Sequence, residues 1–301
     1  MSSSIRVPFI VPVLLGLLGA APLRAQVPES AWPTVESAFG RKGAALPGNV
    51  LKFSYPRTDL TVTVRGVRVM PALALGSWVA FKRVGGSHAM VMGDLVLAED
   101  EVAPVMEALQ RGGVEQTALH NHLIGESPRV MYMHLSVYGE ETKIARTVHD
   151  ALLHTRTPMG EPAVAAPAAF DLDTATVAAT LGYAGKVNGG VYQVSVPRVE
   201  QIFEGEMEVP ASMGVATAIN FQPTGGGKAA VTGDFVMTAV EVNRVIRALR
   251  DNGIDVTALH SHMLAESPRL FFMHFWANDD AVSLARALHT ALAMTNVQPR
   301  K

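Results

Sequence analysis

The pattern of apolar and polar positions predicts strands at the start of the chain and a helix after them. Apolar residues alternate with polar ones, or run together with β-branched residues, in segments 51–54, 60–69, 76–84 and 88–97, as is typical of strands. From residue 98 to about 110, apolar residues recur at helical spacing, and Gly112 and Gly113 mark the end of that helix. Strands 114–123 and 130–138 and a second amphipathic helix, 140–154, complete the pattern.

The same order of elements begins again in the second part of the chain. Segment 191–196 matches 51–56, segment 238–249 matches the first helix, and segment 281–294 matches the second. Residues 156–172 between the two parts are rich in proline and alanine, as linkers are. We therefore predict an α+β fold of two tandem homologous domains, 26–155 and 173–301, each a mostly antiparallel sheet with helices packed on one face. The pattern leaves open whether the two sheets join.

The stretch that the two halves share most fully is rich in histidine. It reads TALHNHLIGESPR at 117–129 and TALHSHMLAESPR at 257–269, and His134 and His274 follow. Every His, Glu, Pro and Arg of this motif recurs 140 residues later, whereas the flanking segments differ much more. The motif is therefore the best candidate for the chemistry of the protein.

Strand geometry predicts that the three histidines of each motif lie on one face. Side chains alternate along a strand, so His120 and His122 point to the same side. The apolar side of the predicted hairpin is formed by Leu119, Leu123, Met131, Met133, Leu135 and Val137. If this side covers the core under the helices, His134 must lie beside His120 and His122, because a slip of one residue would send it into the core.

Three imidazoles and a carboxylate are a ligand set for a divalent ion, and they suit Zn, Mn, Fe, Ni or Cu. The predicted metal ligands are His120, His122, Glu126 and His134, and in the second half His260, His262, Glu266 and His274. The competing interpretation is a structural network of hydrogen bonds in which an Arg-Glu pair holds the loop.

Three functions are compatible with these residues. A metal-dependent hydrolase would use Glu126 and Glu266 as candidate catalytic bases, and Arg129 and Arg269 to hold an anionic substrate. A binding module would use the same groups to capture a metal, an anionic small molecule or a cell-envelope ligand without turnover. A structural module would use them only to fix the hairpin. Both copies of the motif are intact, which favours binding, because a duplicated enzyme often lets one active site decay.

Composition narrows the chemistry and the compartment. A net charge of -2 without runs of Lys or Arg gives no reason to expect nucleic acid as a partner. The absence of cysteine means that nitrogen and oxygen must hold any metal. Residues 1–25 combine Arg6, an apolar run and a Leu23-Arg24-Ala25 end, which predicts a cleaved export signal, no stable membrane span after cleavage, and a periplasmic or secreted protein.

Several runs resemble the LppY/LpqO-like family of exported bacterial proteins, a domain of unknown function. The runs are SYPRTDL at 54–60, GSW at 76–78, AMVMGDL at 89–95 and the segment from Thr117 to His134. The resemblance spans both halves and implies export and a repeated domain, but no reaction. Mycobacterial relatives are named as lipoproteins, and this chain departs from them because it has no cysteine to carry a lipid.

Overall fold

The computed structural model describes residues 1, 31–160 and 170–299. Apart from Met1, the export signal predicted for residues 1–25 lies outside the described residues, and so do residues 161–169 of the predicted linker. The chain separates into two units, 1–31 and 32–301, and the second contains every helix and strand named below. Within the described residues, no helix has the length and apolar character needed to cross a bilayer.

The first half contains a large sheet, a small sheet and the helices that cover them. The large sheet has the order β1-β2-β5-β6-β9-β7 and the small one β4-β3-β8, and all neighbouring strands are antiparallel. The elements are α1 (Pro33–Phe39), β1 (Ala44–Leu46), β2 (Val50–Pro56), β3 (Thr63–Val64), β4 (Val67–Arg68), α2 (Pro71–Ala74), β5 (Gly76–Gly85), β6 (His88–Ala98), the 3-10 helix η1 (Glu99–Glu101), α3 (Val102–Arg111), β7 (Glu115–His120), β8 (Glu126–Ser127), β9 (Val130–Glu140) and α4 (Glu141–Leu152).

The second half repeats this architecture. Its sheets have the orders β10-β11-β14-β15-β18-β16 and β13-β12-β17. The elements are α5 (Thr174–Leu181), β10 (Lys186–Asn188), β11 (Val191–Pro197), β12 (Ile202–Glu204), β13 (Met207–Val209), the 3-10 helix η2 (Ala211–Met213), β14 (Ala216–Gly225), β15 (Lys228–Met237), α6 (Ala239–Asp251), β16 (Asp255–His260), β17 (Glu266–Ser267), β18 (Phe271–Asp280) and α7 (Ala281–Leu292). The α+β fold predicted for two tandem domains is confirmed.

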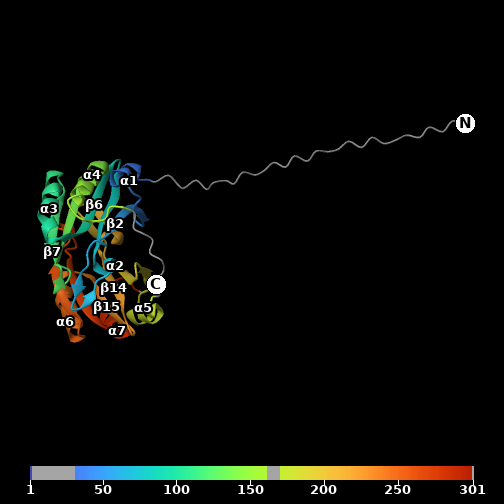
Figure 1. Cartoon of the computed structure of the whole chain (residues 1–301), viewed down its shortest axis with the longest axis vertical. Helices are drawn as coiled ribbons and strands as arrows, with labels where there is room; N and C mark the ends of the chain where they lie inside the picture. Colours follow the sequence, from blue (N-terminus) through green and yellow to red (C-terminus); the bar gives the residue numbers. More distant parts are fainter. Residues whose placement is uncertain (2–30, 161–169, 300–301) are drawn as a thin grey trace. The chain divides into compact units, whose positions relative to one another are not determined.

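Each large sheet has one face under helices. Helices α1, α3 and α4 pack on the first sheet, and α5, α6 and α7 pack on the second (Figure 1). In the first half this core includes Phe53, Phe81, Leu95 and Met133, and the apolar stripes of α3 and α4 close over it. The helices form because these stripes recur at the helical period and have a sheet face to cover.

The opposite faces of the two large sheets pack against each other. One apolar cluster joins Ala80 and Met92 of the first half to Val236 and Phe272 of the second. A second cluster, which contains Tyr132 and Trp276, also draws on both halves. The sheets therefore remain separate but bury each other. This explains why β6 is apolar on both faces, since a strand covered on both sides reads as a continuous apolar run.

Two sequence predictions for local structure are wrong. Segment 60–69 is not one strand, because Arg65 and Gly66 adopt positive φ angles and turn the chain between the short strands β3 and β4. Leu119, expected in the core, is 42% exposed, because β7 is an edge strand. Leu123 is buried, but it lies in the cluster between the halves and not under the helices.

A buried arginine fixes the same corner in each half. In the first half, the Arg57 guanidinium donates hydrogen bonds to Glu101 at 2.7 and 3.1 Å, to Asp59 and to the Val96 carbonyl. In the second half, Arg198 donates in the same way to Glu241, Glu200 and the Val236 carbonyl. These networks tie the turn after β2 to strand β6, and the turn after β11 to strand β15.

Candidate metal centre between the sheets

Three neighbouring strands of each sheet bring an aspartate and two histidines onto the face between the halves. In the first half, Asp94 on β6 is in register with His134 on β9, and His134 is in register with Ala118 on β7, two residues before His120. The second half repeats this register with Asp234 on β15, His274 on β18, and Ala258 and His260 on β16. Antiparallel pairing thus places these side chains on one face, as the alternation argument expected for the histidines.

The third histidine of each half follows the end of its strand and is held by the other half. The sequence predicted a strand through Leu123, but β7 ends at His120. The Thr257 hydroxyl donates to the His122 carbonyl at 2.6 Å, and the Thr117 hydroxyl donates to the His262 carbonyl at 2.5 Å. These two hydrogen bonds, one from each half to the other, hold both histidines at the boundary between the two sheets.

The six imidazole rings stack across that boundary. Centroid distances are 3.6 Å between His120 and His260, 3.7 Å between His122 and His274, and 3.9 Å between His134 and His262. Two of these stacks continue into a further aromatic ring. The ring centroid of Tyr132 lies 3.3 Å from that of His122, and the ring centroid of Phe272 lies 3.5 Å from that of His262. Every stack between the halves therefore joins a ring from one copy of the motif to a ring from the other.

Many polar atoms of this cluster are buried without a hydrogen-bond partner. They are Asp94 Oδ1, His120 Nδ1, His122 Nε2, His134 Nε2, Asp234 Oδ1, and His260 Nδ1 and Nε2. Buried polar groups normally have partners, because an unpaired one costs about 1–3 kcal/mol. A cation would satisfy several of these unpaired nitrogen and oxygen atoms at once.

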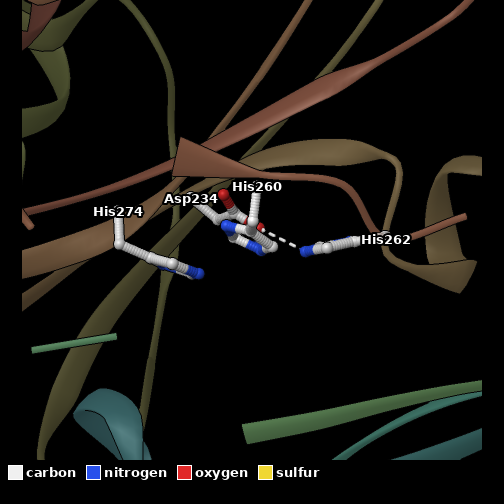
Figure 2. A group of neighbouring side chains, drawn as sticks. All are labelled: Asp234, His260, His262 and His274. Carbon is white, nitrogen blue, oxygen red and sulfur yellow. Dashed lines mark ion pairs between the residues drawn. The ribbon is translucent and has the colours of Figure 1, made fainter. Parts of the chain in front are cut away.

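Two groups of these side chains have ligand atoms close enough to share an ion. His120, His122 and His134 form one group, and Asp234, His260, His262 and His274 form the other, with all ligand atoms of a group within 4.8 Å of one another. Figure 2 shows the second group, in which the dashed line joins His262 Nε2 to Asp234 Oδ2 at 3.0 Å. Imidazole with one carboxylate suits first-row transition ions better than Mg²⁺ or Ca²⁺.

The aspartates were missed by the sequence prediction, although a signal for them exists. Asp94 and Asp234 are the only charged residues in the interior of β6 and β15, and they match at the same offset as the histidines. A carboxylate within an otherwise apolar strand needs a partner. That pattern would have identified both residues as candidate ligands.

Burial favours the neutral form of five of the six histidines. It lowers the pKa of His120 to about 3, with further lowering by the neighbouring His274 and His262. Burial is also the main cause that lowers the pKa of His122, His134, His260 and His274. Neutral imidazoles present a lone pair, which is the form that binds a metal ion.

The two aspartates have different surroundings. Burial, followed by the charge of Asp234, raises the pKa of Asp94 well above its usual range, and Lys52 opposes this shift. For Asp234, burial also acts to raise the pKa, but His274 and His262 outweigh it, so the pKa is lowered. The second half therefore has the stronger anionic ligand. Lys52, which opposes the shift of Asp94, lies 4.0 Å over the Trp78 ring, and burial lowers the pKa of Lys52 to about 8.

The glutamates predicted as metal ligands belong to neither group of ligand atoms within the described residues. Glu266 is buried in its own loop, where its carboxylate accepts from the Leu270 backbone N–H at 2.9 Å and pairs with Arg269 at 3.1 Å. Glu126 occupies the same position in β8, which pairs with β3 of the small sheet. The pairing of these short strands holds both glutamates away from the face that carries the histidines.

The arginines predicted to bind an anion also differ between the halves. Arg269 donates to Glu266, to the Ser261 hydroxyl and to the carbonyls of Met263 and Leu264, so it braces its own loop. Arg129 is exposed and lies 3.8 Å from Glu99, which is equally exposed. Such an exposed pair stabilises the fold little.

Comparisons with known proteins support the duplication and assign no reaction. A family model described as "Domain of Unknown Function (DUF1259)" matches residues 33–154 and again residues 175–294. No curated protein has a significant match to the chain.

Among solved structures, a trimeric bacterial microcompartment shell protein, PduB, aligns at 10% identity and a TM-score of 0.22, covering 84% of this chain and 90% of its own. EtuB from Clostridium kluyveri aligns at 13% identity and a TM-score of 0.21, covering 83% and 90%. Similarity this low carries no argument about fold or function.

Proposed function

The chain belongs to the DUF1259 family of domains of unknown function, in two tandem copies, and we propose that this protein binds two divalent transition-metal ions between its two sheets. The observation that carries the proposal is the set of buried nitrogen and oxygen atoms without partners on Asp94, Asp234 and the histidines facing them. Two divalent ions would satisfy these atoms, because each ion accepts several lone pairs at once.

The choice of ion follows from the donor atoms. Imidazoles with a carboxylate suit Zn, Mn, Fe, Ni or Cu. Asp234 is the carboxylate of the second group, and Asp94 lies 3.7 Å from His122 in the first half. The hydrogen bond of His274 also supports binding, because its Nδ1 lies 2.8 Å from the Gly233 carbonyl. A ring nitrogen that donates its proton to a carbonyl leaves the other nitrogen free as a ligand, and metal-binding histidines are usually oriented in this way.

Binding without turnover accounts for the site better than hydrolysis does. A catalytic metal needs an open coordination position and room for a substrate. Here the side chains of His122, His134 and His262 are only 13%, 4% and 8% exposed, and rings of the other half cover them. A purely structural hairpin would explain the contacts between Glu266 and Arg269, but not the unpaired nitrogens.

We also propose that the protein is exported to the periplasm or secreted. The N-terminal segment 1–25 has the composition of an export signal, and the runs shared with LppY/LpqO-like proteins agree with export. The mature chain would then consist of domains 26–155 and 173–301 joined by the linker 156–172. An anionic small molecule or cell-envelope ligand would have to use Arg129, which is exposed, whereas Arg269 is hydrogen-bonded to its own loop.

The experiment is a metal analysis of the full chain purified without a histidine tag and loaded by dialysis. The wild type should hold two ions per chain, and a His134→Ala, His274→Ala double variant should hold fewer. His154→Ala is the matched control, because His154 is exposed and outside both groups, and it should keep two ions. If the wild type retains no ion after dialysis against the metal, the cluster is structural.

A further inference from the structure

We propose that His120 of the first half is a ligand of the ion held by the second half, together with Asp234, His262 and His274. This deepens the proposed function and rests on it. The ion would then join the two sheets, and the centre would exist only where the two copies of the motif meet.

The distance between two ring nitrogens carries the proposal. His120 Nε2 lies 3.4 Å from His274 Nε2. Two nitrogen ligands of one tetrahedral zinc ion, each at about 2.0–2.1 Å, are separated by about 3.4 Å. A direct N–H···N hydrogen bond is an inferior explanation, because protein N–H hydrogen bonds are usually about 2.7–3.2 Å long.

The orientation of His274 agrees with this arrangement. With its Nδ1 proton donated to the Gly233 carbonyl, the lone pair of its Nε2 points toward the first half. The planes of the His120 and His274 rings are also nearly parallel, with an angle of 14° between them and centroids 5.4 Å apart. Two rings that meet through their nitrogens in this way can share an ion between them.

The rings that face His120 across the boundary belong to the second half. Its ring centroid lies 3.6 Å from that of His260 and 5.4 Å from that of His274. Asp234 lies 3.0 Å from His262. With His120, Asp234, His262 and His274, an ion at this point would have one carboxylate and three imidazoles, the four ligands that a tetrahedral ion takes, and His260 of the same group would be a fifth ligand within reach.

The first half keeps enough ligands without His120. Asp94 Oδ2 lies 3.7 Å from His122 Nε2, and Asp94 Oδ1 lies 3.9 Å from His134 Nε2. These three side chains form a set of their own for the first ion. The alternative is that His120 serves its own half, because its ligand nitrogen is also within 4.8 Å of those of His122 and His134.

Counting ions in combined variants separates the two assignments. With Zn²⁺ as the probe, Asp234→Asn should reduce two ions per chain to one, because the second ion loses its charged ligand. Adding His120→Ala to Asp234→Asn should leave one ion, since His120 served the ion that is already lost. If His120 serves its own half, the same combination should hold none.

His122→Ala added to Asp234→Asn is the matched control, and it should hold no ion under either assignment. His120→Gln replaces His120→Ala if the alanine variant does not unfold cooperatively, since Gln keeps a polar side chain in this position. A combined variant with no ion overturns the role of His120 but leaves the proposed function intact. A wild type that binds no Zn²⁺ overturns both.

Discussion

His120 and His260 occupy equivalent positions in the two halves, and their rings stack on each other with centroids 3.6 Å apart. The duplicated motifs therefore meet at one place. Each half supplies three rings and an aspartate to a region that the other half covers. Duplication thus creates the burial that keeps five of these imidazoles neutral and available to a cation.

The stability of the metal-free protein should fall as the pH falls. The folded pKa of His120 is about 3, below the ordinary histidine value of about 6.5, so the unfolded chain binds more protons between these values. The contribution of His120 to stability is present above about pH 6.5 and is lost as the pH falls toward its folded pKa. Urea unfolding in a chelator at pH 7.5, 6.5 and 5.5 should show this decline.

A variant with His120→Asn and His260→Asn provides the comparison. The decline between pH 7.5 and 5.5 should be shallower in this variant, because two buried imidazoles that resist protonation have been removed. Equal slopes for the wild type and the variant would contradict the assignment of the acid sensitivity to these rings.

Arg57→Met should destabilise the protein by about 3–5 kcal/mol, because the buried carboxylate of Glu101 loses the closer of its two guanidinium partners, Arg57 at 2.7 Å, and keeps only Arg156 at 3.4 Å. Denaturant unfolding measures the loss. Arg111→Met is the control, since the Arg111–Glu107 pair is exposed and worth about 0–1 kcal/mol. Similar losses of stability in both variants would show that burial does not determine how much the Arg57 network stabilises the fold.

Gly233→Ala should destabilise the second sheet and weaken metal binding. A Cβ at this position would collide with the backbone carbonyl of Ala218, and overpacking of this kind costs about 1–3 kcal/mol. The Gly233 carbonyl also orients His274, and Asp234 is the next residue, so both candidate ligands should shift. Urea unfolding and Zn²⁺ titration measure the two effects.

Gly139→Ala is the control for that substitution. The added methyl group would meet only Ile144 Cδ1, at an ordinary contact distance of 3.5 Å. Its stability should be equal to or slightly above that of the wild type, because glycine weakens the interior of a strand. A Gly233→Ala variant as stable as Gly139→Ala would mean that the backbone at Gly233 relaxes without cost.

The fold within each half could be predicted from the sequence, because its signals are local. The apolar period of the segment that forms α4 and the alternation along β9 assign Met133 to the helical side and His134 to the opposite side. The packing of one half on the other could not be predicted in this way. It depends on contacts such as Thr117 with His262, which are far apart in the sequence.

The ligand groups of the structure differ from the predicted ligand set for the same reason. Glu126 and Glu266 were chosen because they are near the histidines in the sequence, but the short strands β8 and β17 turn them into the small sheets. Asp94 and Asp234 were missed because they are distant in sequence and enter the site only through strand pairing. Leu119 was assigned to the core because alternation alone does not reveal that β7 is an edge strand.

The most direct test of the central claim is anomalous diffraction from crystals of the zinc-loaded full chain, measured on both sides of the zinc absorption edge. We expect two anomalous peaks between the sheets, each about 2.0–2.1 Å from histidine nitrogens, with one peak beside Asp94 and the other beside Asp234. The peak beside Asp234 should also contact His120. Well-ordered His120, His134 and His274 rings without an anomalous peak among them would contradict metal binding at this site.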